Sequence, residues 1–290
     1  MVFLAFCGLF HLALRVYEAV FKTVPDFPQG WLLALYLGLS LSCTLYRRRP
    51  LMHKVYTIRE KDVKLEICIG DIFAKPGCTI IPTNTSFDIK ANETLIAETS
   101  IQGKFQKRLQ WEDDDLSTYL KNKLQHTAVT RERKSYVGGN TQIYPMGTAV
   151  QINIQPYSYI MLAMAELNEN GAAHSSRRDI ETALDSLWDF LHNAATFADE
   201  INIPVLGTRY GRSNLSISET TLLIASSFIR ATLDRSFTKK LRIIIYQEDF
   251  YKYNVLFYEI NNILRPMCSS PVLLTNLINT TSPEIQTRWP

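Results

Sequence analysis

VKLEICIGDIFAKPGCTIIPTN, residues 63–84, contains two short apolar runs that each end in polar residues. Residues 63–69 alternate apolar and polar side chains as a half-buried strand does, and residues 78–81 continue the sheet. Gly70-Asp71-Ile72 follows the first run, and Pro82-Thr83-Asn84-Thr85 follows the second. In α/β sheets ligands bind at the carboxyl ends of strands. We therefore expect both polar segments to be functional loops.

The rest of the chain beyond residue 54 alternates strand and helix patterns. Three apolar runs bounded by turn signals predict strands buried on both faces, and one weaker strand candidate precedes residue 63. These strands are expected at 158–165, 201–206, 241–246 and 55–60. Helices are expected at 116–127, 177–197, 217–233 and 250–264. The alternation predicts an α/β fold, a three-layer α/β/α sandwich with a mixed or largely parallel sheet.

A third loop, residues 206–211, follows the strand at 201–206 and precedes the helix at 217–233. Gly207 and Gly211 permit backbone conformations closed to other residues, so that successive N–H groups can converge on a diphosphate. An ordinary strand-to-helix turn is the alternative. Three side chains lie between the glycines. Thr208 could add a hydroxyl, and Tyr210 could pack its ring against a ribose. The Arg209 guanidinium could pair with phosphate or equally point into solvent.

Two side chains of the first two loops carry recognition chemistry. The carboxylate of Asp71 can accept a hydrogen bond from an exocyclic amine, or it can cap a turn. The amide of Asn84 offers a donor and acceptors to a ribose hydroxyl, although asparagine in a loop also commonly forms turns.

The order of these three loops, from about residue 63 to the helix at 250, resembles that of macro domains. Residues 100–105, SIQGKF, resemble a loop of one macro-domain subgroup, the ThsA-type effectors of bacterial Thoeris antiphage defence. The resemblance implies an adenine contact at Asp71 and a diphosphate contact at residues 206–211. The ligand-binding residues it implies are Asp71, Ile72, Thr83, Asn84, Gln102, Gly103, Lys104, Leu206, Gly207, Thr208, Arg209, Tyr210 and Gly211.

The same resemblance implies a sensor rather than an enzyme. Its ligand would be an ADP-ribose derivative made from NAD by a TIR-domain partner, in this branch a histidine conjugate, and binding would trigger homo-oligomerisation and membrane disruption. No cofactor is implied. The alternatives are a macro-domain hydrolase anchored to the membrane, which no Ser/His/Asp, HExxH or paired-carboxylate motif supports, and a structural tether, which leaves the three loops unexplained.

The first 54 residues predict a membrane anchor with two transmembrane helices. Residues 27–46 hold no charge and are long enough to cross a bilayer core, and Arg47, Arg48, Arg49 and Lys54 then form a basic junction expected to stay in the cytosol. Residues 2–21 form the other predicted span. The two helices would be joined by a short external loop at 22–30. This places both termini in the cytoplasm and the protein in the inner membrane, with residues 55–290 as a cytosolic macro domain.

Polar and small residues mark the two predicted spans. His11, Arg15 and Glu18 are spaced four and three apart, which puts them on one helical face. In one interpretation Arg15 and Glu18 lie near the far membrane–water interface, and their side chains extend so that the charged groups reach water. In the other, the three residues form a polar face turned to partner helices or a water path. In the second span Ala34, Gly38 and Ser42 form a stripe that would let another helix approach closely, unless the spacing arose by chance.

Charge and cysteine content exclude other functions. The net charge of +3 arises in the anchor, because 25 basic and 26 acidic residues remain beyond residue 54. Without net positive charge the cytosolic part is not expected to bind nucleic acid. Five cysteines without CxxC spacing argue against a disulfide framework or a zinc site. We expect no metal, since Asp113–Asp115 suit a solvated helix start and His126, His174 and His192 are scattered singly.

Overall fold

The computed structural model describes residues 53–271 with gaps at 60, 90–95, 110, 112, 134–138, 194–197, 208–212, 254 and 256. Before residue 53 it describes positions 8, 12, 15–17, 19–20, 38 and 41–42. The chain divides into two compact units, Met1–Leu51 and Met52–Pro290.

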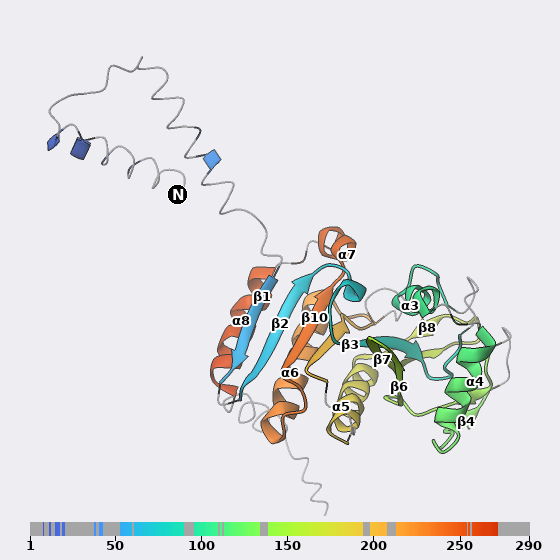
Figure 1. Ribbon diagram of the computed structural model, residues 1–290. Helices are drawn as coiled ribbons and strands as arrows, with labels where there is room; N and C mark the ends of the chain where they lie inside the picture. The colour runs from blue at the N-terminus through green and yellow to red at the C-terminus, as the bar shows by residue number, and fades with distance from the viewer. Residues whose placement is uncertain are drawn as a thin grey trace, which may run out of the picture. The chain divides into compact units, whose positions relative to one another are not determined.

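Eight strands of the second unit form one mixed sheet (Figure 1). Their order is β1 (His53–Ile58), β2 (Val63–Ile69), β10 (Lys240–Ile245), β9 (Glu200–Pro204), β3 (Cys78–Asn84), β7 (Tyr157–Leu167) and β6 (Ala149–Ile154), with β8 (Ala173–His174) paired to β7. The five central strands, β2, β10, β9, β3 and β7, run parallel to one another, whereas β1, β6 and β8 pair antiparallel to their neighbours. A separate short hairpin joins β4 (Arg131–Glu132) to β5 (Gln142–Ile143). The mixed α/β sheet predicted from the sequence is confirmed.

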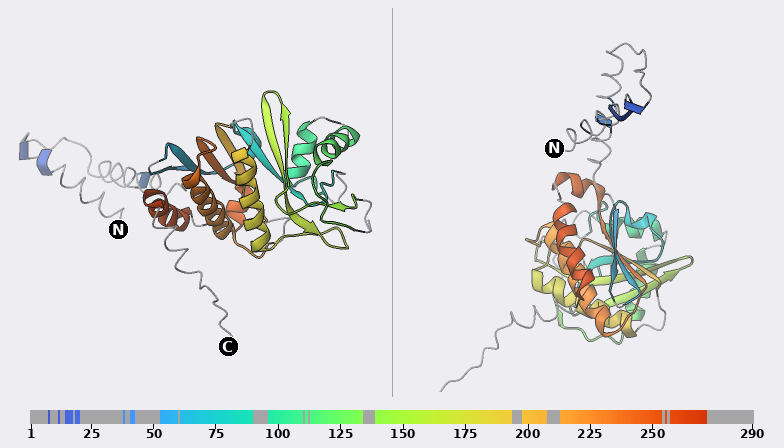
Figure 2. Two further views of the ribbon diagram at one scale, coloured as in Figure 1. Left: turned by 90° about the horizontal axis from the view of Figure 1, so that it is seen from below. Right: turned by 90° about the vertical axis from the view of Figure 1, so that its left-hand side faces the viewer.

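Helices cover the sheet on both faces (Figure 2). One face carries α5 (Arg177–Asn193), α6 (Ile217–Asp234) and α8 (Phe257–Ser269), and these helices pack with the sheet into the larger apolar core. The other face carries α3 (Ile101–Leu109) over β3 and α4 (Asp113–Leu124) over β6. Two short helices follow strands directly, η1 (Ile72–Ala74) after β2 and α7 (Gln247–Lys252) after β10.

The apolar stripe of α5 explains why this helix lies flat on the sheet. Ile180, Leu184, Leu187 and Leu191 recur every three or four residues and are all buried. Trp188 lies on the same side, donates its indole N–H to the Ser227 hydroxyl of α6 at 2.7 Å, and stacks on Phe237. The buried polar edge of the ring is thereby satisfied, and α5 is fixed against α6.

Sequence expectations and observed elements differ in several places. The single helix expected at 250–264 is two helices, α7 and α8, separated by residues 253–256. Residues 101–105, part of a segment expected as a loop, instead form the first half of α3, and strands β4, β6 and β8 were not predicted. The remaining predicted strands and helices are present with shifted ends, and α4 begins at Asp113, as the solvated-start interpretation of the acidic run required.

Three cysteines are described, Cys68, Cys78 and Cys268, and each is a buried free thiol. Burial raises the pKa of Cys78 to about 11 and that of Cys268 to about 12, and it also raises the pKa of Cys68. Thiolates are therefore not formed at neutral pH, and these residues serve packing. Cys7 and Cys43 lie outside the described residues.

The described positions of the first unit are helical and exposed. They include three large apolar side chains, Leu12, Val16 and Val20, together with Arg15. Within the part of the chain that the structure describes, no helix has both the length and the apolar character needed to span a bilayer. The predicted spans at 2–21 and 27–46 fall almost wholly outside the described residues, as do His11, Glu18, Ala34 and the basic junction at 47–49.

A buried ionic network ties the parallel strands together on the face opposite α5, α6 and α8. Arg242 of β10 lies 3.1 Å from a Glu66 carboxylate oxygen on β2 and 3.0 Å from one of Glu200 on β9. It also donates to the Asn202 side chain at 2.7 Å. Burial by itself lowers the pKa of Arg242, but its two carboxylate partners outweigh that effect and the pKa is raised. Only 5% of Arg242 and of Glu66 is exposed, so each charge depends on the other.

We therefore expect Arg242→Met to lower the free energy of unfolding by about 3 to 5 kcal/mol, because Glu66 would lose its buried partner and keep only Lys240, at 3.8 Å, and the exposed His53. Urea titration followed by tryptophan fluorescence measures the loss. Arg230→Met is the matched control, since Arg230 pairs with Asp185 at 3.0 Å on the surface and should contribute less than about 1 kcal/mol. Equal losses in the two variants would contradict the role assigned to Arg242.

Candidate functional site

A cavity of about 550 Å³ lies at the carboxyl edge of the parallel sheet. Each of the parallel strands that contributes to it ends there, so the cavity is lined by segments far apart in the sequence. These are 70–73 after β2, 82–84 of β3, 164, 165 and 167 of β7, 204, 205 and 207 at the end of β9 and beyond it, and 244–246 and 249 at the end of β10 and beyond it. Helix α3 and the segment before it, 96–102, complete the wall. The volume lies in the range of small-molecule sites.

Asp71 combines the two roles that its sequence position left open. It is the N-cap of η1, and one carboxylate oxygen accepts the backbone N–H of Phe73 at 3.1 Å. The residue also lines the cavity, next to the buried side chain of Ile72. The cap bond fixes the carboxylate, and its other oxygen accepts nothing from the described residues. Asp71 is thus held in place to accept a ligand donor.

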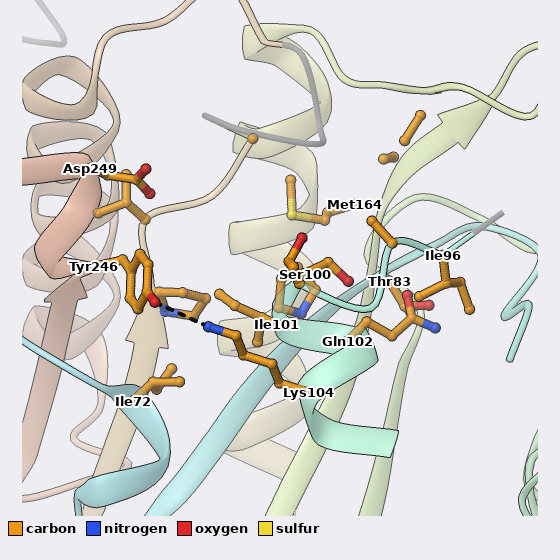
Figure 3. Close-up of a pocket in the computed structure, with 18 of the residues that line it drawn as sticks. Ile72, Thr83, Ile96, Ser100, Ile101, Gln102, Lys104, Met164, Tyr246 and Asp249 are labelled. Carbon is orange, nitrogen blue, oxygen red and sulfur yellow. Dashed lines mark hydrogen bonds between the residues drawn. The ribbon is translucent and has the colours of Figure 1, made fainter. Parts of the chain in front are cut away.

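Tyr246 and Lys104 face each other beside Asp71. Figure 3 shows the Lys104 ammonium, from α3, donating to the Tyr246 hydroxyl, at 3.3 Å. The ammonium also lies 4.4 Å from the centre of the Tyr246 ring. Asp249 lies on the next turn of the chain, buried and lining the same end of the cavity. An aromatic ring, two carboxylates and one cation therefore gather around this end.

Thr83 and Asn84 lie at the end of β3, where the pairing with β7 shifts register. Such an irregularity turns a strand away from its neighbour and redirects its side chains. The Thr83 hydroxyl is buried, lines the cavity and has no hydrogen-bond partner among the described residues, which leaves it for a ligand.

Asn84 is mainly an organiser of its own loop. Its side-chain oxygen accepts the backbone N–H groups of Ser86 and Asp88 at 3.1 and 3.2 Å. This holds Phe87, between them, at a φ of 49°. Asp88 in turn is 2% exposed and pairs with Arg133 at 3.1 Å. Because its oxygen is used by the loop, only the NH2 group of Asn84 remains to contact a ligand.

The segment SIQGKF supplies Gln102 and Lys104 to the cavity wall but not Gly103. Gln102 donates to the backbone oxygen of Asp88 at 2.7 Å and so ties α3 to the loop after β3. Gly103 packs against the backbone of residues 97–98, where a Cβ would find no room. The glycine therefore allows the segment before α3 to pack against this helix, and it does not line the cavity.

Gly207 lines the cavity with a φ of 73°, a conformation that favours glycine. Its backbone oxygen accepts the N–H and the hydroxyl of Ser213 at 2.9 and 3.0 Å, so the turn is closed on itself. Leu206 does not line the cavity, because it is 1% exposed and packs in the core beneath. Thr208, Arg209, Tyr210 and Gly211 lie outside the described residues.

Sequence reasoning missed two parts of the wall. Tyr246 ends the predicted strand at 241–246, so the same strand-end rule that selected Asp71 would have found it. The turn between β7 and β8 places 170–173 in the lining, and its Asn170-Gly171 pair is a hairpin signal. Asn168 fixes this turn by accepting the backbone N–H groups of Asn170 and Ala172 at 3.0 and 2.9 Å.

Within the described residues no group of three or more His, Cys, Asp or Glu side chains is placed to hold a metal ion.

Comparisons with known proteins agree with this fold. Thoeris protein ThsA of Bacillus amyloliquefaciens is 23% identical over 237 residues, which are 79% of this chain and 77% of that protein. A mutant of the Oceanobacillus iheyensis macrodomain is similar in structure, with a TM-score of 0.50, 12% identity, and coverage of 75% of this chain and 96% of that one. At that identity the likeness shows the fold alone. The family model described as Thoeris protein ThsA, Macro domain matches residues 65–246, well over half of the chain, and the chain therefore belongs to this macro-domain family.

Proposed function

We propose that residues 53–271 bind ADP-ribose or a derivative of it in the cavity at the carboxyl edge of the sheet. The observation that carries this proposal is the arrangement of the lining. One end of the lining suits a purine with an exocyclic amine. The Asp71 carboxylate could accept a hydrogen bond from the amine, and the Ile72 side chain and the Tyr246 ring could pack against the base. The left-handed turn at Gly207 suits a diphosphate. The Thr83 hydroxyl and the Gln102 side chain then meet the distal ribose.

The protein is proposed to bind this ligand without cleaving it. Among the described lining residues the only carboxylates are Asp71 and Asp249, and no histidine or cysteine joins them. In Figure 3 Asp249 lies beside Tyr246, away from Thr83 and Gln102. A general base for hydrolysis at the distal ribose would have to lie within reach of that ribose. The described residues at that end are uncharged.

The sensor is proposed to act at a membrane. Membership of the ThsA macro-domain family supports a signal made by a TIR-domain partner, with a histidine conjugate of ADP-ribose as the ligand. Residues 1–54 would anchor the protein in the inner membrane with both termini in the cytoplasm. Exposed Leu12, Val16 and Val20 beside the charge of Arg15 are suited to a helix that meets lipid on one side and polar partners on another.

Binding is proposed to drive assembly of several copies, which would turn the Arg15 face inward and breach the bilayer. A nearly complete switch requires the ligand to favour the assembled state by about 5.5 kcal/mol. A ligand contacted by several copies would supply this preference.

Calorimetric titration of the full chain with ADP-ribose and with its histidine conjugate, followed by mass spectrometry of the recovered ligand, tests the binding proposal. We expect saturable binding and an intact conjugate. Release of ADP-ribose and histidine from the conjugate would favour the hydrolase, and the absence of binding to ADP-ribose and its conjugate alike would reject the proposal.

Gly207→Val should weaken binding by about 100-fold. Valine is strained at this φ, and a Cβ would lie 2.8 Å from the Ser213 hydroxyl, so the turn must distort. Each lost hydrogen bond to a charged group costs about 1.5 to 3 kcal/mol.

Gly147→Val is the matched control for Gly207→Val. Gly147 has a φ of 86°, and its Cβ would meet the Ser186 side chain, yet it lies outside the cavity lining. It should lower stability to a similar degree and leave ligand affinity unchanged. Retained affinity in Gly207→Val, or equal loss in both variants, would remove the turn from the ligand site.

Dye release from liposomes carrying the full chain tests the membrane proposal. Leakage should require the histidine conjugate of ADP-ribose and should disappear in Gly207→Val. It should fall in Arg15→Leu, which removes the charge without removing the ligand site. Leakage that does not depend on ligand, or tight binding and assembly without leakage, would leave residues 1–54 as a passive anchor.

A further inference from the structure

A second hollow, of about 690 Å³, opens beside the first cavity between α3 and α7. The two share Gly70, Asp71, Phe73, Lys104 and Tyr246 in their linings, so they are neighbours at the end of the site where the purine is proposed to lie. Arg108 and Tyr251 line only the second hollow. The Lys104 ammonium and the Tyr246 ring, 4.4 Å apart, line both.

Arg108 is held against aromatic side chains, of which only Phe73 lines the hollow. Its guanidinium lies 5.8 Å from the centre of the Phe73 ring and 5.5 Å from that of Tyr157. It also contacts the Tyr159 hydroxyl, whose pKa is raised by burial and held down in part by this cation. These contacts orient the guanidinium without neutralising it.

Neither cation of the hollow has a carboxylate partner. No ion pair formed between described residues includes Lys104 or Arg108, although Lys107, on the same helix, pairs with Glu98. Lys104 and Arg108 are four residues apart and therefore project from one face of α3. The partial negative charge at the C-terminal end of a helix favours cations in the last turn, and both Lys107 and Arg108 lie there. This effect does not explain why Lys104 and Arg108 line the same hollow.

Two carboxylates also border the hollow, Asp71 and Glu248. Asp71 lies in both linings, and under the proposed function its free oxygen is engaged by the purine amine. An anion would therefore bind nearest Arg108, beside the Phe73 ring. The planar guanidinium offers paired N–H donors that match phosphate oxygens.

We propose that this second hollow binds a phosphomonoester carried on the adenosine half of the ligand, with Arg108 as its principal donor and Lys104 moving off Tyr246 to join it. The inference rests on the proposed function, since it takes the purine to lie at Asp71 and Tyr246. A phosphate on the adenosine ribose, as in the 2′-phosphate of ADP-ribose, has the required chemistry. The protein would then distinguish phosphorylated from unphosphorylated forms of one nucleotide.

Titrations of the full chain with ADP-ribose and with its 2′-phosphate test this directly. We expect the 2′-phosphate to bind about tenfold more tightly, and the advantage to shrink as salt is raised, because the hollow is open to solvent. Inorganic phosphate should compete with the 2′-phosphate and leave binding of ADP-ribose unchanged, which separates recognition of the phosphate itself from recognition of the nucleotide.

Arg108→Gln should reduce the ratio of the two affinities to about one, whereas Lys107→Gln, on the same helix but outside the lining of the hollow, should keep the wild-type ratio. Thermal melting of both variants controls for folding. Binding of ADP-ribose with no gain from the 2′-phosphate would overturn this inference and leave the proposed function standing. An unchanged ratio in Arg108→Gln would also overturn it, and failure of both ligands to bind would reject the two proposals together.

Discussion

Burial of the central strands on both faces is the constraint that shapes this molecule. On β10, Leu241, Ile243 and Ile245 enter the larger core, while Arg242 and Ile244 are buried on the opposite face. A strand covered on both sides has little room for polar side chains that could meet a ligand. Recognition groups are therefore displaced to the strand ends, and parallel pairing brings those ends to one edge. The cavity lies at that edge for this reason.

The Glu66–Arg242–Glu200 network is the exception that this constraint permits. Three charges on adjacent strands satisfy one another across β2, β10 and β9. Replacing such a network with apolar side chains is often neutral for stability, so its presence suggests that it fixes how these strands pair. Lys240 contacts the same carboxylates, at 2.6 Å from Glu200 and 3.8 Å from Glu66.

Much of this architecture could be predicted from the sequence because local pattern and tertiary role coincide. The apolar runs of β2, β3, β9 and β10 are short and bounded by turn residues, and α5 carries a regular apolar stripe. Strand β6 was missed although its sequence, AVQINI, alternates apolar and polar side chains as a half-buried strand does. The break between α7 and α8 was missed because the apolar pattern continues from Phe250 through Val255 to Phe257, all of which are buried although the chain turns between them.

The cavity lining could be predicted where a polar residue or a glycine follows a strand end, as at Asp71, Thr83 and Gly207, and less well where packing decides which residues line it. Gly103 and Leu206 belong to segments that form the cavity wall, yet Gly103 is needed because a Cβ would block the backbone of residues 97–98, and the Leu206 side chain packs in the core. Asn84 was expected to face a ligand, but its oxygen holds the loop. Only three-dimensional contacts separate these roles. The pairing of Lys104 with Tyr246 joins residues 142 positions apart, beyond the reach of any local pattern.

The central claim is that this edge of the sheet binds an adenine nucleotide with its purine between Ile72 and Tyr246. A crystal structure of the protein with ADP-ribose tests it most directly. The account predicts the exocyclic amine within hydrogen-bond distance of the Asp71 carboxylate and the diphosphate at the turn of Gly207. A nucleotide bound elsewhere, or bound in this cavity with its purine at Thr83 and Gln102, would contradict it.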